Sequence, residues 1–169
     1  MKALRLQPNP RFAEFQEIIV AHPEWLKPWS GTLFRFQTIE FPSAEEILSG
    51  EGARMRGGRW NQPGSAAVYG STTDTTALEE CKANDRYYGI ETKNPRLLVA
   101  IDAQLSGVLD LTSTGIRRTL GVTLKELAAE DWQKLMQVGR ESSSQALVAP
   151  RRPWARAACW SVRPRSRTG

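Results

Sequence analysis

Short strand-like runs alternate with helical patterns along this chain, but the alternation never reaches the regular spacing of βαβ units. Apolar and β-branched runs predict strands at residues 32–36, 65–71, 96–103 and 107–112. Helical spacing of apolar residues and capping residues predict helices within residues 9–26, 42–58, 73–85, 123–139 and from residue 142. A single α+β domain is therefore expected, because a parallel sheet would need regularly repeated crossover helices.

Length and composition exclude several classes of protein. A chain of 169 residues with 40% hydrophobic residues can bury the core of one domain. No apolar run is long enough to span a membrane, and the N-terminal residues do not resemble a signal peptide, so we expect a cytoplasmic protein with no membrane partner. The single histidine, His22, and the two cysteines, Cys81 and Cys159, argue against a metal site, a disulfide framework and a Ser-His-Asp triad.

Positive charge is concentrated near the C-terminal end of the sequence. Residues 151–169 hold six Arg and no acidic residue, which leaves 17 Lys and Arg against 18 Asp and Glu elsewhere. The rest of the chain is near neutral, so we expect no direct binding of nucleic acid despite the pI of about 9.6. The rival hypothesis, a nucleic-acid-binding tail, predicts binding that falls steeply with salt and is lost without residues 151–169.

Four residues in and before the segment GGRWNQPGSAAVYGSTTDTTALEE, residues 57–80, are candidates for one site. A guanidinium suits phosphate, a tyrosine at a strand end can stack on a flat heterocycle with its hydroxyl in water, and a carboxylate on the next helix can face the same cleft. These parts suit a dinucleotide and cleavage at a ribose C1′ through an oxocarbenium-like state. The candidates are Arg35, Arg59, Tyr69 and Glu80, with the Ser71 hydroxyl beside them.

The runs LFRF, GEGARMRGGRWNQPG, AAVYGS and TTALEE resemble the RES domain, the toxin half of RES–Xre toxin–antitoxin systems. The resemblance extends from about residue 32 to about residue 147 and is most specific through residues 50–81. It divides the chain into an N-terminal helical segment, a RES-like domain and an atypical Arg- and Pro-rich tail. These parts are residues 1–31, 32–147 and 148–169.

The resemblance implies a fold similar to ADP-ribosyltransferase toxins of the diphtheria-toxin type, with a mixed or antiparallel split sheet flanked by helices. The implied function is binding of NAD+ and cleavage of its nicotinamide–ribose bond, as a glycohydrolase or phosphorylase. NAD+ is then the substrate, and neither a resident cofactor nor a metal is expected. Two alternatives remain open: transfer of ADP-ribose to a protein, and an inactive remnant that only binds an antitoxin. The expected protein partner is an Xre-like helix-turn-helix antitoxin.

The resemblance also implies roles for the candidate residues. Glu80, Arg35 and Tyr69 match catalytic positions of the family, and Arg59 matches its second arginine. Arg59, Arg35, Tyr69 and Ser71 are expected to bind the substrate. The tripeptide Arg140-Glu141-Ser142 spells the family name by coincidence and is not expected to be the site.

The tail departs from the family pattern. Val148 stands where family members have a glycine, and the late apolar strand that carries the family's signature serine is missing. Ser161 lies in no strand-like run, so we assign it no role. One hypothesis is that the gene has lost a single base near the codon for Val148. The nucleotide sequence would refute it if no other reading frame of this region encoded a helix, a turn and an apolar strand. The alternative is a divergent, disordered basic tail.

Overall fold

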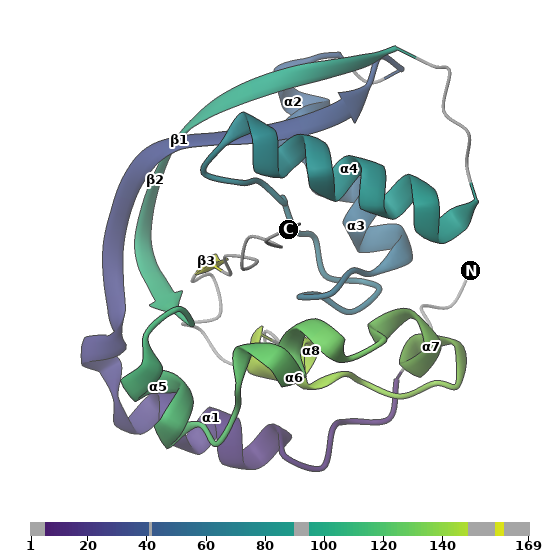
Figure 1. Ribbon diagram of the computed structural model, residues 1–169. Coiled ribbons are helices and arrows are strands. Elements are labelled where there is room, and N and C mark those ends of the chain that lie inside the picture. Colours follow the sequence, from purple (N-terminus) through teal and green to yellow (C-terminus); the bar gives the residue numbers. More distant parts are fainter. Residues whose placement is uncertain (1–5, 41, 90–94, 149–157, 161–169) are drawn as a thin grey trace, which may run out of the picture.

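Two long antiparallel strands and a set of short helices make up the described part of the chain in the computed structural model (Figure 1). The structure describes residues 6–40, 42–89, 95–148 and 158–160. The helices are α1 (Phe12–Ala21), the 3-10 helix η1 (Pro23–Trp25), α2 (Ala44–Leu48), α3 (Glu51–Arg56), α4 (Asp74–Tyr88), α5 (Thr114–Thr119), α6 (Leu124–Ala129), α7 (Trp132–Gln137) and α8 (Ser143–Val148). The strands are β1 (Leu26–Thr38), β2 (Arg96–Asp110) and β3 (Ala158–Trp160).

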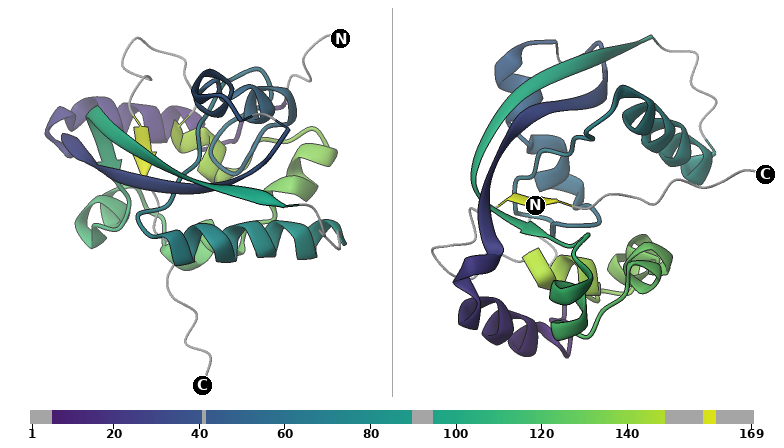
Figure 2. Two further views of the ribbon diagram at one scale, coloured as in Figure 1. Left: turned by 90° about the horizontal axis from the view of Figure 1, so that it is seen from above. Right: turned by 60° about the vertical axis from the view of Figure 1, so that its left-hand side comes forward.

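The strands β1 and β2 form one long, curved antiparallel ribbon (Figure 2). Their register shifts once, between Lys27 and Trp29, because Pro28 has no N–H to donate to the ladder. β3 pairs in parallel with the C-terminal end of β2, so the sheet order is β1-β2-β3. Helix α4 packs against β1 and lies inside the curve of the ribbon (Figure 1).

The hydrophobic core lies at one end of this ribbon, where the C-terminal end of β2 meets several helices (Figure 1). The buried apolar residues come from α1, β2, the segment 111–127 and α8, and they are Phe15, Ile19, Leu109, Leu111, Leu120, Val122, Leu127, Ala146 and Leu147. Full burial of such a side chain stabilises the fold by roughly 1.5–3 kcal/mol. The core therefore anchors α8 and the start of α6, which both reach the site described below.

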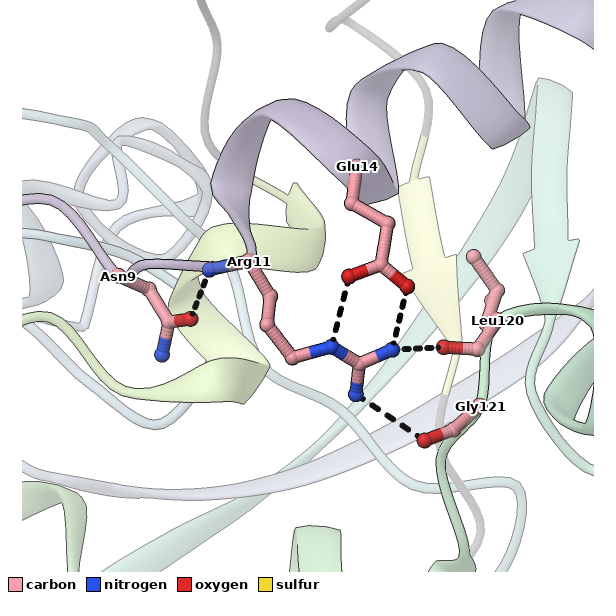
Figure 3. Close-up of polar contacts among 5 residues, drawn as sticks. All are labelled: Asn9, Arg11, Glu14, Leu120 and Gly121. Atoms are coloured by element: carbon pink, nitrogen blue, oxygen red, sulfur yellow. Dashed lines mark hydrogen bonds and ion pairs between the residues drawn. The ribbon is translucent and has the colours of Figure 1, made fainter.

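An arginine at the start of α1 joins that helix to the end of α5 (Figure 3). The guanidinium of Arg11 donates hydrogen bonds to the carbonyl oxygens of Leu120, at 2.7 Å, and Gly121, at 3.0 Å. The same group pairs with the Glu14 carboxylate at 2.8 Å, which holds it in place. Helix carbonyls beyond the last turn lack partners inside the helix, and Arg11 supplies donors to two of them.

Two expectations of the fold are confirmed, the α+β class and the capping residues at helix starts. The chain is an α+β mixture, and α2 begins with a capping box between Ser43 and Glu46. Thr73 caps α4 by accepting a hydrogen bond from the Thr76 backbone N–H at 3.1 Å. Within the described ranges, no helix has the length and apolar character that a membrane crossing would need.

Two strand predictions are wrong. Residues 65–71 do not form a strand, because their backbone pairs with β1 only at the isolated bridge between Ser71 and Phe34. Residues 96–103 and 107–112 were expected as separate strands, but the single strand β2 covers most of both. The segment from Pro28 to Gly31 has turn-forming residues, yet it lies within the strand β1.

The helix expected over residues 123–139 is two helices, α6 and α7. The break falls at Glu130 and Asp131, whose side chains bind helix N-termini instead of continuing the helix. The Glu130 carboxylate accepts hydrogen bonds from the backbone N–H of Ser143, at 2.8 Å, and Asp131 accepts one from the N–H of Lys134, at 3.1 Å. The tail prediction for residues 148–169, including Ser161, lies largely outside the described residues.

Candidate functional site

A cleft of about 1130 Å³ brings the predicted residues together. Its lining residues come from helix α4, from α6 and α7, and from α3 with the loop after it. Figure 1 shows α4 on one side of α3 and the pair α6 and α7 on the other. The residues predicted from the sequence that line it are Arg35, Arg59, Tyr69 and Glu80. They come from β1, from the loop after α3 and from α4, so the fold gathers them from three separate elements.

Glu80 lies half-buried in the first turns of α4 and faces the cleft. Its carboxylate accepts a hydrogen bond of 3.1 Å from the hydroxyl of Ser71, which is 6% exposed. The neighbouring Glu79 lies on the exposed face of the helix and pairs with Lys82 at 3.0 Å. Of the two adjacent carboxylates, only Glu80 can therefore act in the cleft.

Ser71 also explains how Arg35 comes to the same place. The Ser71 N–H donates to the Phe34 carbonyl oxygen at 2.8 Å, and the Phe34 N–H donates to the Ser71 carbonyl oxygen at 2.7 Å. Phe34 is next to Arg35 on β1. Within the described residues, the Arg35 guanidinium makes one hydrogen bond, a long one of 3.5 Å to the Ile47 carbonyl oxygen. Burial lowers the pKa of Arg35, since desolvation disfavours its charged form. A partly desolvated guanidinium with so few acceptors is suited to an anionic ligand.

The loop after α3 holds Arg59 by carbonyl contacts. Its guanidinium donates to the carbonyl oxygens of Leu127, at 2.6 Å, and Glu130, at 3.3 Å. These bonds connect the loop to the end of α6 and orient Arg59 along the cleft wall. Arg59 therefore links the two sides of the site, in addition to any contact that it makes with a substrate.

Tyr69 holds the same loop by its hydroxyl group. The hydroxyl accepts a hydrogen bond of 3.0 Å from the Trp60 backbone N–H and donates one of 2.7 Å to Asn61 Oδ1. We expected this hydroxyl to face water, and that expectation is wrong because the loop folds back over it. Gly58 makes this possible, since a Cβ there would collide with the Tyr69 hydroxyl. The ring of Tyr69 still lines the cleft.

A buried glutamine on α8 supports the loop from behind. The amide nitrogen of Gln145 donates to the carbonyl oxygens of Gly58, at 2.9 Å, and Asn61, at 3.3 Å. Its amide oxygen accepts a hydrogen bond of 3.0 Å from the Ser142 N–H, and the side chain is 0% exposed. Gln145 therefore fixes the backbone on both sides of Arg59.

Comparison with known proteins agrees with this arrangement. The RES domain family model matches residues 32–164. The chain belongs to the RES family. It is 30% identical over 118 residues to proteins named NAD(+) phosphorylase MbcT from Mycobacterium tuberculosis and Mycobacterium bovis. The aligned part covers 66% of this chain and 60% of those proteins, so the chain spans about three fifths of the length of these curated relatives.

A solved structure is also similar. The crystal structure of the M. tuberculosis MbcT–MbcA toxin–antitoxin complex contains a chain that superposes with a TM-score of 0.63. Identity to that chain is 27%, and the match covers 79% of this chain and 67% of that one. This RES domain thus shares both sequence and fold with a toxin of a toxin–antitoxin complex.

Two arginines near the glycine pair, Arg54 and Arg56, were weaker candidates in the sequence. Arg56 lines the RES cleft, whereas Arg54 lies outside and pairs with Glu51. Sequence reasoning missed the aromatic residues Tyr87 and Trp132, which also line the cleft. The helical spacing of Tyr87 from Glu80 was the available signal for the first of these.

No group of three His, Cys, Asp or Glu side chains able to hold a metal ion occurs within residues 6–40, 42–89 and 95–148. Cys81, next to Glu80, is half-buried, and desolvation raises the pKa of its thiol. A thiol with a raised pKa is a poor nucleophile at neutral pH, so Cys81 fits a packing role in the helix.

Proposed function

We propose that this RES domain binds NAD+ in the cleft and cleaves the bond between nicotinamide and ribose. The observation that carries the proposal is the meeting of Glu80 with Arg35, Arg56 and Arg59 in one cleft. Carboxylate and guanidinium groups together suit a substrate that is anionic at its pyrophosphate and becomes cationic at the reacting sugar. The relatives named NAD(+) phosphorylase support the choice of substrate.

The proposed reaction breaks the C1′–N bond of the nicotinamide ribose. Nicotinamide leaves with the bonding electron pair, and the positive charge moves to the ribose as an oxocarbenium-like state. The Glu80 carboxylate stabilises that charge, and the Ser71 hydroxyl orients the carboxylate by its hydrogen bond. At about 4 Å and an effective dielectric near 20, the attraction amounts to roughly 4 kcal/mol. That corresponds to about three orders of magnitude in rate.

We propose inorganic phosphate as the acceptor of the ADP-ribosyl group, with an oxygen of phosphate forming the new bond at C1′. The name of the relatives and the three arginines of the cleft support an anionic acceptor. Water would give free ADP-ribose instead, and a protein acceptor would give an ADP-ribosyltransferase. The fold is proposed to be ADP-ribosyltransferase-like, and the substrate NAD+ needs no resident cofactor or metal for this chemistry.

We also propose that the chain acts in the cytoplasm and binds an antitoxin of the Xre type. The similar solved chain is part of a toxin–antitoxin complex, which supports an antitoxin partner. Co-purification with the product of an adjacent small helix-turn-helix gene tests the partner. Recovery of the chain alone after co-expression would contradict it.

The experiment that tests the function is NAD+ depletion by the purified chain, with products resolved by mass. We expect loss of NAD+, with ADP-ribose phosphate formed when phosphate is present. Glu80→Gln should lower the rate about a thousandfold, because it keeps the shape and removes the charge. Glu79→Gln is the matched control, since Glu79 is exposed and pairs with Lys82 outside the cleft. Equal rates for Glu80→Gln and wild type would refute the role of Glu80, and a folded wild type that consumes no NAD+ would indicate the inactive alternative.

A further inference from the structure

One face of α4 extends the site well beyond Glu80. Glu80, Asn84, Tyr87 and Tyr88 all line the cleft, and their spacing of four, seven and eight residues places them on one side of the helix. Seven residues of helix separate Glu80 from Tyr87 by about 10 Å. The cleft therefore has an inner end at Glu80 and an outer end at Tyr87.

The outer end is aromatic and open to solvent. Tyr87 is 47% exposed and Tyr88 is 55% exposed, and their rings meet edge to face with centroids 5.1 Å apart. Trp132, at the start of α7, contributes a third aromatic side chain from the opposite wall. The C-terminal end of α4 and helix α7 lie on the same side of the molecule (Figure 1). Large aromatic side chains that line a cleft from two walls are suited to stacking on a flat ring.

The charges of the cleft differ between its two ends. Arg35 lies on β1 and Arg56 on α3, whereas Arg59 bonds the carbonyl oxygens of Leu127 and Glu130 at the end of α6. At the outer end, Asp131 faces Tyr87. The pKa of the Tyr87 phenol is raised mainly by desolvation and next by the negative charge of Asp131. A carboxylate disfavours phosphate nearby, so an anionic linker is favoured at the arginines and an uncharged ring at the outer end.

We propose that Tyr87 and Trp132 form the subsite for the adenine base of NAD+, which makes the domain selective for dinucleotides over nicotinamide mononucleotide. This inference rests on the proposed function, because it orients the same substrate in the same cleft. With adenine between the two walls at the outer end, the pyrophosphate lies toward the arginines and the nicotinamide ribose reaches Glu80. The stretch of about 10 Å along α4 leaves room for the linker between the two bases.

The kinetic test compares kcat/KM for NAD+ with kcat/KM for nicotinamide mononucleotide, which lacks the adenosine half. Stacking on one base is worth about 1–3 kcal/mol, so Tyr87→Ala and Trp132→Ala should each lower the NAD+ preference about 5- to 150-fold. Tyr87→Phe keeps the ring and should retain most of that preference. Arg86→Ala, on the same helix but outside the lining of the cleft, is the matched control. An unchanged preference in Tyr87→Ala, or equal losses with both substrates, would overturn the inference.

A binding measurement separates this inference from the proposed reaction. ADP-ribose carries the adenine and pyrophosphate but no nicotinamide, so its affinity does not depend on turnover. By calorimetry, Arg86→Ala should bind ADP-ribose as wild type does, whereas Tyr87→Ala should bind it at least about fivefold more weakly. If wild type consumes no NAD+ and this pattern appears, the subsite stands and the reaction fails. If Tyr87→Ala binds as tightly as wild type, or wild type does not bind, the subsite is refuted.

Discussion

Replacing Gln145 by methionine tests how far α8 holds the Arg59 loop in place. Methionine has a similar volume and leaves no large cavity, so the change isolates the loss of the amide group. The Asn61 carbonyl keeps a second partner, the Gly58 N–H at 2.9 Å. The Gly58 carbonyl likewise keeps a second donor, the Asn61 N–H at 3.4 Å. The main loss is therefore the acceptor of the Ser142 N–H. A buried group left without a partner costs about 1–3 kcal/mol, and this is the destabilisation that we expect.

Urea unfolding followed by tryptophan fluorescence measures this loss. With a slope near 2 kcal/mol per molar urea, the midpoint should fall by about 0.5–1.5 M. Ser144→Ala is the matched control, because the adjacent Ser144 hydroxyl is buried without a hydrogen-bond partner in the described structure. Its removal should leave the midpoint unchanged or raise it slightly. Equal midpoints for Gln145→Met and Ser144→Ala would refute the idea that the amide supports the loop.

Three further predictions concern the site and its scaffold. Gly58→Ala should lower kcat/KM for NAD+ at least about tenfold, because the added Cβ lies 2.8 Å from Asn61 Oδ1 and must displace the loop; steady-state kinetics of the folded variant test this. Arg35→Lys should raise KM more than it lowers kcat, because an ammonium cannot replace a planar guanidinium fork; unaltered KM would contradict it. Arg11→Met should lower the free energy of unfolding by about 1–2 kcal/mol and leave KM unchanged, since Arg11 binds only α1 and the end of α5 among the described residues. Urea unfolding measures the first effect, and steady-state kinetics on the same preparation measures KM.

Local signals in the sequence predicted the parts of the site that depend on short-range structure. Residue 73 was expected to begin a helix, and Thr73 caps α4. The choice of Glu80 came from the resemblance to the RES domain, and Glu80 lines the cleft. Tyr69 was expected to keep its hydroxyl in water, but that hydroxyl bonds Trp60 and Asn61. The roles of the five predicted site residues remain predictions.

Long-range contacts account for what the sequence could not predict. The run at residues 65–71 has the composition of a strand but pairs with β1 only at Ser71, so it forms no ladder. The amphipathic pattern over residues 123–139 was continuous, but Glu130 binds the N–H of Ser143 and ends α6 early. Nothing in the local sequence around Gln145 shows that its amide meets Gly58, because the partners lie 87 positions apart.

The distance in sequence between Gly58 and Gln145 determines when their contact can form in a nascent chain. The ribosome adds Gly58 long before Gln145, and at about 5–20 residues per second the interval is on the order of 4–17 seconds. During this time the carbonyls beside Arg59 lack the amide that later holds them. The loop around Arg59 is therefore fixed only after α8 has left the exit tunnel. A partner that captures the unfinished chain would meet it before the arginine loop is in place.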